Sequence, residues 1–142
     1  MEATPGNVID YERIRQHIED LNDNYPIREI AIDRWNSTQL HTQLTDGGLI
    51  VVPFGQGYKD MSAPTKELGA LVLSKRLRHA GNPVLHWMAG NVAVLQDAAG
   101  NLKPAKDKSA DRIDGVVATI MGLGRLMVSS SVDGFYVSSG LE

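Results

Sequence analysis

The chain has 142 residues, 42% of them hydrophobic, which fits one soluble globular domain with its own core and leaves no room for a second full domain. The formal net charge of −3 argues against nucleic-acid binding through bulk positive charge, so any contact with DNA must come from a local basic patch. The absence of cysteine excludes disulfides and Cys-ligated zinc and favours a reducing cytoplasm, and we expect neither a signal peptide nor a membrane span.

The first half of the chain predicts a helix followed by one βαβ unit. Residues 7–24 carry apolar side chains at helical spacing, and Asn7 or Asp10 could cap this amphipathic helix. Three further elements follow: a buried strand at Ile27–Asp33, a helix over residues 36–48 that ends at a glycine pair, and a strand covered on both faces at Leu49–Phe54. Strand, helix and strand in this order predict a parallel pair.

The next segment predicts two more helices. Ser62 and Pro64 are favourable residues at a helix start, and the apolar spacing continues to about His79. After a glycine and a proline break the chain, Val84–Ala89 has the composition of a short helix.

The last third predicts a hairpin, a long helix and a tail. Val92–Gln96 and the residues around Leu102 should pair as a small hairpin. The last strong helix should open at Ser109 and continue to about Met127, with one apolar stripe made of Ile113, Val116, Val117, Ile120 and Met121. We expect the Ser- and Gly-rich residues 129–142 to form a flexible tail.

Asp33 is the first residue that could carry chemistry. It ends a strand predicted to be central, and parallel sheets place their ligand sites at the carboxyl ends of strands. A carboxylate there must be solvated, paired or bound to a metal, because a bare buried charge is too costly. The other interpretation is a helix cap, since the next helix begins only a few residues later, and position alone does not decide between the two.

Asp111 and Asp114 are the second acidic feature. Three residues apart near a predicted helix start, they would share one helix face, and such pairs most often only stabilise the helix dipole. Asp114, however, lies within the apolar run of residues 113–118. We therefore expect a partly buried carboxylate that faces Asp33, an arrangement that can hold Mg²⁺ or Mn²⁺ for phosphodiester hydrolysis.

Basic residues surround this acidic helix start. Lys103, Lys106, Lys108 and Arg112 would usually form a solvated face, but beside a metal they could hold phosphates. The four histidines, His17, His41, His79 and His86, fall on different predicted helices and share no metal-ligand spacing. The glycines at residues 55–57 lack the pattern of a P-loop, so no ATP site is expected.

Four segments, taken in order, resemble the C-terminal nuclease region of the large terminase subunit of tailed phages. They are Thr4–Tyr11 (TPGNVIDY), Ala31–Asn36 (AIDRWN), Gly81–Leu85 (GNPVL) and Lys106–Ala118 (KDKSADRIDGVVA), and the resemblance extends to about Arg125. It implies an RNase H-like fold and a nuclease that cuts concatemeric DNA during genome packaging with two divalent metal ions. It further implies that Asp33 is the second acidic metal ligand and Asp114 the third, with Asp111 beside it.

The sequence also departs from that family. Family members are much longer, with a packaging ATPase, and their nuclease begins with a three-stranded meander that carries a first catalytic Asp, for which this chain has no counterpart. We therefore expect an α/β fold equivalent to the latter part of an RNase H-like domain: a small parallel sheet flanked by helices in residues 1–128, without the meander. As an endonuclease it should be weak or inactive alone.

Several partners and one competing class follow from this interpretation. The resemblance implies Mg²⁺ or Mn²⁺, double-stranded DNA held by Lys106, Lys108 and Arg112, the terminase small subunit and the portal, all in a host cytoplasm. Without the meander, the strand at residues 27–33 would keep an open edge and recruit a second copy, which predicts a homodimer. The competing class is a noncatalytic packaging or portal-docking module, or a prophage remnant, in which the acidic residues are only structural.

Overall fold

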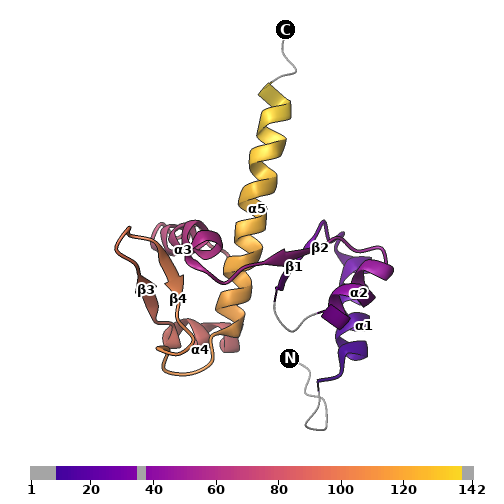
Figure 1. The fold of residues 1–142 in the computed structure, drawn as a ribbon, viewed down its shortest axis with the longest axis horizontal. Coiled ribbons are helices and arrows are strands. Elements are labelled where there is room, and N and C mark those ends of the chain that lie inside the picture. The colour runs from indigo at the N-terminus through magenta and orange to yellow at the C-terminus, as the bar shows by residue number, and fades with distance from the viewer. Residues whose placement is uncertain (1–8, 35–37, 139–142) are drawn as a thin grey trace. The chain divides into compact units, whose positions relative to one another are not determined.

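The computed structural model describes residues 9–34 and 38–138, with the side chains of residues 130–138 excepted. The chain forms two compact units, residues 1–53 and 54–142, where the composition predicts a single domain (Figure 1). The division falls inside one apolar run, because the Phe54 ring packs on Gly124 and Pro64 of the second unit. Within the described residues, no helix is long and apolar enough to cross a membrane.

The first unit opens with helix α1 (Tyr11–Asn24), as the spacing predicts. Asp10 caps it, because its carboxylate accepts a hydrogen bond of 3.1 Å from the backbone N–H of Arg13. Asn7 lies outside the described residues. The helix packs against α2 (Thr38–Asp46), whose Leu44 is almost completely buried. Burial of this leucine anchors the small core of the first unit.

Strands β1 (Ile30–Asp33) and β2 (Val51–Phe54) form the predicted small parallel sheet around α2. At the start of β1, the backbone N–H of Ile30 donates to the carbonyl of Ile50, the residue just before β2, at 2.8 Å. Within the described residues this sheet has only these two strands, so β1 is not the central strand that the sequence suggests. The expectation of cover on both faces is also wrong at Ile50, which is 64% exposed.

The second unit begins with α3 (Tyr58–Leu73), and here the predicted bounds are wrong. The helix starts before Ser62, because the carbonyl of the N-cap Gly57 already accepts from Met61 at 3.0 Å, and Pro64 lies inside the helix. The Pro64 ring is buried and packs close to Gly124, a contact that offsets the missing N–H donor. Buried Ser62 accepts from the backbone N–H of Leu102 at 3.1 Å and so fastens the hairpin to α3.

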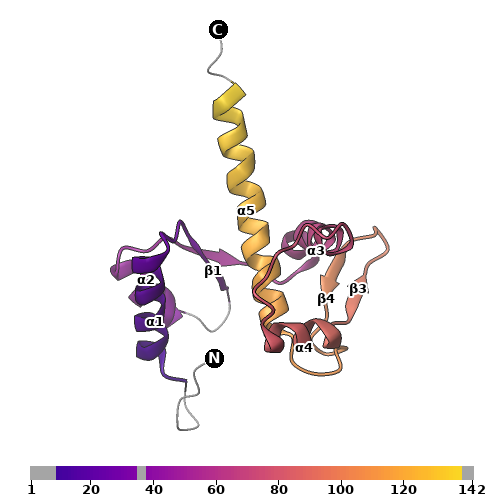
Figure 2. The ribbon, with the colours of Figure 1, turned by 180° about the vertical axis from the view of Figure 1, so that it is seen from behind.

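The hairpin and the short helix are confirmed. Strands β3 (Val94–Gln96) and β4 (Leu102–Pro104) pair antiparallel, with Leu95 opposite Lys103. Helix α4 (Pro83–Asn91) is capped by Asn82, whose side chain accepts from the next two free backbone N–H groups at 3.0 and 3.1 Å. The hairpin lies beside α3, and α4 lies beside the first half of α5 (Figures 1 and 2).

Helix α5 (Asp114–Ser138) carries the core of the second unit. Its predicted stripe is confirmed: Val116, Val117, Ile120 and Met121 are buried, together with Ile113 just before the helix. The helix does not open at Ser109, because that hydroxyl accepts from Ala93 and donates to Ala105, which holds residues 105–109 in turns. The helical backbone also continues past Met127 to Ser138, where we expect a tail, since no proline interrupts it.

Candidate functional site

Asp33 lies where the sequence places it, at the carboxyl end of β1. Its side chain is half-buried in the first unit. It is the last residue of β1, and α2 begins at Thr38. The strand-end position is confirmed, and the choice between a metal ligand and a helix cap stays a prediction.

Asp114 is the first residue of α5, but its environment differs from the predicted one. The carboxylate is 57% exposed rather than partly buried, and its Oδ1 lies 2.8 Å from Lys106 Nζ. Lys106 lowers the pKa of Asp114, with smaller contributions from Arg112 and from the backbone N–H of the helix start. The neighbouring cations therefore favour the ionised form of Asp114.

Asp111 does not share a helix face with Asp114, contrary to the prediction. The residue lies outside α5, is exposed, and its Oδ1 accepts from the backbone N–H of Arg112 at 2.7 Å. A side chain that bonds to its neighbouring backbone in this way favours a turn over a helix. The two carboxylates are thus presented by different local structures.

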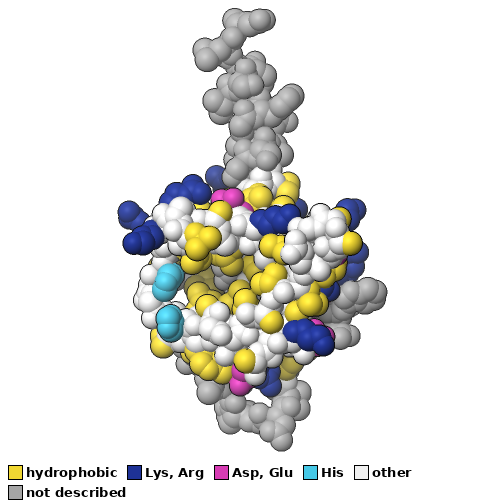
Figure 3. Space-filling model, turned by 90° about the vertical axis from the view of Figure 1, so that its left-hand side faces the viewer, with side chains coloured by type: hydrophobic (Ala, Val, Ile, Leu, Met, Phe, Trp, Pro, Cys, Tyr) yellow, Lys and Arg dark blue, Asp and Glu magenta, His cyan; other side chains and the backbone are white. Residues whose placement is uncertain are grey.

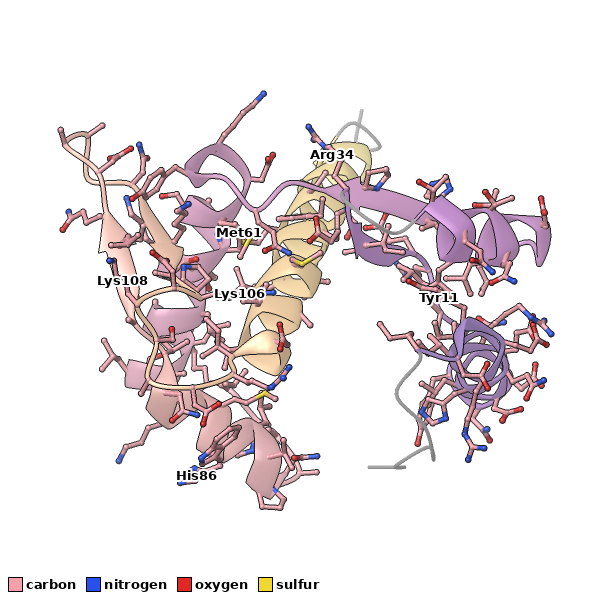
Figure 4. All side chains as sticks on the ribbon, turned by 60° about the horizontal axis from the view of Figure 1, so that its bottom comes forward. Tyr11, Arg34, Met61, His86, Lys106 and Lys108 are labelled. Atoms are coloured by element: carbon pink, nitrogen blue, oxygen red, sulfur yellow. The ribbon has the colours of Figure 1, made fainter. Side chains whose placement is uncertain are left out.

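The basic residues around Asp114 differ in how closely they are paired with an acidic side chain. Lys106 is committed to the ion pair with Asp114, whereas Lys108 is mostly exposed and reaches Asp107 only at 3.9 Å. In Figure 4, Lys106 lies beside α5 and Lys108 lies farther from that helix. Sequence spacing did not predict the Lys106–Asp114 pair, because turns rather than a regular helix bring the two residues together. Lys103 instead stands 5.0 Å above the ring of Tyr58.

Histidines do not form a metal site among the described residues. His17, His41 and His86 lie on helices α1, α2 and α4 as predicted, but His79 lies outside any helix, because α3 ends earlier. There the Nδ1 of His79 accepts from the backbone N–H of Gly81 at 3.1 Å. Among the side chains that the structure describes, in residues 9–34 and 38–129, no three from His, Asp or Glu gather in a group that could hold a metal ion.

Asp33 belongs to the first unit and Asp114 to the second. The surroundings of each carboxylate are therefore described only within its own unit. That Asp33 and Asp114 bind the same ion stays a prediction. Both side chains offer carboxylate oxygens, the type of donor that hard cations prefer.

Comparison with known families identifies the class of protein. The sequence model described as "Terminase large subunit, endonuclease domain" matches residues 1–130, and the chain belongs to this family. The resemblance seen in the sequence is thus confirmed.

Two curated relatives extend the match. The large terminase subunit of Enterobacteria phage HK97 is 39% identical over 126 residues, which are 87% of this chain and 25% of that protein. Protein YmfN of Escherichia coli (strain K12) is 39% identical over 134 residues, 92% of this chain and 29% of that protein. The chain therefore spans between a quarter and a third of the length of these relatives.

The fold agrees with a solved structure of the same family. The crystal structure of the HK97 bacteriophage large terminase superposes with a TM-score of 0.78 and 40% sequence identity, over 86% of this chain and 26% of that one. This match confirms the predicted α/β fold with its small parallel sheet.

Proposed function

We propose that this chain supplies acidic metal ligands to a divalent-metal-dependent endonuclease that cuts DNA during genome packaging. The observation that carries the proposal is the position of Asp33 at the carboxyl end of a parallel strand, in a chain whose residues 1–130 match a terminase endonuclease domain. The resemblance assigns the second acidic position to Asp33 and the third to Asp114.

The donor set fits Mg²⁺ or Mn²⁺. Asp33 and Asp114 offer carboxylate oxygens, which these ions prefer, and a metal ion would have to displace Lys106 from Asp114. When bound, divalent ions stabilise the negative charge on the attacking and leaving oxygens of a phosphodiester. Asp111, which is already used by the backbone N–H of Arg112, would contribute less. Lys106, Lys108 and Arg112 would hold phosphate oxygens nearby.

Cleavage by this chain alone should be slow. The resemblance implies three acidic positions, and only two of them are matched here, so at least one metal ion would be poorly held. Plasmid incubated with the pure chain and Mg²⁺ should stay largely intact. Robust nicking that disappears in Asp33→Asn would refute this expectation and would require another acidic ligand, with Asp10 and Asp97 the first to test.

Calorimetric titration with Mn²⁺ tests the site itself. Asp33→Asn and Asp114→Asn should abolish binding, and Asp111→Asn should only weaken it. Asp107→Asn is the matched control, because Asp107 is an exposed carboxylate on the same segment whose nearest cation, Lys108, is 3.9 Å away. Equal effects of all four variants, or no binding by the unmodified chain, would contradict the proposal.

The ion pair between Lys106 and Asp114 favours a second candidate, a noncatalytic packaging or portal-docking module. In that role Lys106 permanently neutralises Asp114, and the pair contributes at most about 1 kcal/mol of stability because it is exposed. Lys106→Gln separates the candidates. If Asp114 binds metal, removal of the competing ammonium should strengthen Mn²⁺ binding, whereas in a noncatalytic module neither form should bind Mn²⁺.

The proposed partners follow from the family. They are double-stranded DNA and, in the longer protein, the terminase small subunit and the portal, encountered in the cytoplasm of a phage host. We also propose a homodimer through the edge of β1, because unpaired strand edges recruit partners. Sedimentation at micromolar concentration tests it: a monomer with amides of residues 27–33 protected from hydrogen exchange would exclude the dimer.

A further inference from the structure

Residues 74–82 (SKRLRHAGN) concentrate positive charge in a chain that is acidic as a whole. The segment contains Lys75, Arg76 and Arg78 within four positions and has no Asp or Glu, against a net charge of −3 for the chain. Every residue from 74 to 82 is exposed. The segment runs over the surface of the second unit from α3 to α4 (Figure 2), and the face in Figure 3 carries several Lys and Arg side chains around its rim.

The backbone at the start of this segment is unusual. The N–H of Lys75 donates to Val72 at 3.1 Å and the N–H of Arg76 donates to Leu71 at 2.9 Å, the hydrogen bonds that close a helix with a left-handed residue. That residue is Lys75, with φ 56°, at a position that glycine usually occupies. Because a lysine is strained there and glycine is not, the helix end alone does not explain the choice of a lysine.

The charges of the segment are poorly compensated. The guanidinium of Arg76 donates through Nε to Ser74 Oγ at 3.0 Å and reaches Glu67 only at 3.9 Å. Within the part of the chain that the structure describes, neither Lys75 nor Arg78 has an acidic partner within 4.0 Å. Lys106, in contrast, is 2.8 Å from Asp114. The segment at the end of α3 is therefore better prepared for an external anion than the lysine beside α5.

A stabilised helix dipole is the ordinary explanation for basic residues after a helix C-terminus. It accounts for one or two charges in the last turn, but the effect fades beyond that turn and does not require Arg78. It also does not favour a strained lysine over glycine at the cap. Three exposed cations within four positions, two of them guanidinium groups that can bind phosphate oxygens in pairs, suit a polyanion.

We propose that Lys75, Arg76 and Arg78 bind the phosphate backbone of duplex DNA, without reading its sequence. This inference rests on the proposed function, because duplex DNA is the polyanion that such an endonuclease must hold. The contact is separate from Asp33 and Asp114 and needs no metal ion. It supplies the local basic patch that an acidic chain requires to approach DNA.

Binding is measured by fluorescence anisotropy with a labelled DNA duplex of 30 base pairs, in EDTA so that metal binding plays no part. Lys75→Gly and Arg78→Gln should each weaken binding by about five- to tenfold near 0.1 M salt, and each should lower the slope of log affinity against log salt by about 0.9. Lys75→Gly should not lower the melting temperature, because glycine accepts the left-handed backbone. This retained stability excludes unfolding as the cause of a weaker complex.

Lys59→Gln is the matched control, since Lys59 is an exposed lysine in the first turn of the same helix, at the end opposite to Lys75. The proposal is overturned if Lys59→Gln weakens binding as much as Lys75→Gly or Arg78→Gln, or if the unmodified chain does not bind the duplex. It is also overturned if a polyglutamate peptide of equal charge competes as well as DNA, because the segment would then take an acidic protein partner.

The outcome is independent of the metal proposal. Failure of Mn²⁺ to bind, with the effects of Lys75→Gly intact, would refute only the metal site. Unchanged DNA affinity in Lys75→Gly and Arg78→Gln, with Mn²⁺ bound at Asp33, would refute only the basic DNA contact.

Discussion

Two glycines in α5 should respond to the same substitution with opposite signs. A Cβ added at Gly124 would lie 2.8 Å from Phe54 Cζ, 3.0 Å from Phe54 Cε2 and 3.2 Å from Pro64 Cγ. Phe54 and Pro64 are both buried, so neither ring has free space to retreat into. A Cβ at Gly122 would meet nothing within 4 Å. Alanine at Gly122 therefore reports the helix propensity of α5 alone, whereas alanine at Gly124 also reports how tightly α5 packs on Phe54 and Pro64.

The expected magnitudes follow from two effects. Alanine in a helix interior is more stable than glycine by roughly 1 kcal/mol, which is the whole effect expected at the open position of Gly122. At Gly124 the overpacked core costs about 1–3 kcal/mol, which exceeds that gain. We therefore expect Gly122→Ala to stabilise the chain by roughly 1 kcal/mol and Gly124→Ala to destabilise it by up to about 2 kcal/mol.

Urea unfolding followed by circular dichroism measures both free energies under one set of conditions. The two variants should differ by about 1–3 kcal/mol, which is the overpacking cost at Gly124, because the gain in helix propensity is common to both and cancels. Equal stabilisation by Gly122→Ala and Gly124→Ala would refute the packing of Phe54 and Pro64 against α5, and with it the position of the helix that presents Asp114.

Two further predictions concern single hydrogen bonds. Ser62→Ala should cost about 1–3 kcal/mol in urea unfolding, because the backbone N–H of Leu102 loses its acceptor at a buried position; a cost near zero would contradict this. Asn101→Ala should raise the pKa of Asp97 in a carboxyl NMR titration, because hydrogen bonds from Asn101 hold that pKa below its usual value. Since the folded pKa lies below the unfolded one, the associated stability is present above about pH 4 and is lost as the pH falls through the folded pKa. An unchanged pKa in the variant would show that Asn101 is not its cause.

The apolar stripe of α5 could be predicted because apolar residues at helical spacing lie on one face of a helix, and that face is the one that becomes buried. Ile113, Val116 and Ile120 repeat every three or four residues and form the buried face. The start of α3 could not be predicted in this way. Proline is most common in the first turn, and only the contact of Pro64 with α5 explains its place inside the helix.

The candidate site could be predicted only in part. The strand-end position of Asp33 follows from local sequence, because a short apolar run ends there. The ion pair of Lys106 with Asp114 depends on turns in residues 105–109, where Ser109 accepts a hydrogen bond from the backbone N–H of Ala93, 16 residues earlier in the chain. Such long-range contacts have no signature in local spacing, whereas the apolar run of residues 113–118 predicts a partly buried Asp114.

The central claim is that Asp33 and Asp114 bind one divalent ion. Paramagnetic NMR tests it most directly, because bound Mn²⁺ broadens the signals of nearby amides. We predict that substoichiometric Mn²⁺ broadens the amides around both Asp33 and Asp114 with the same concentration dependence, and that Asp33→Asn abolishes the broadening at both places. Broadening around Asp114 that persists in Asp33→Asn, or an unaffected Asp33 in the unmodified chain, would contradict the shared site.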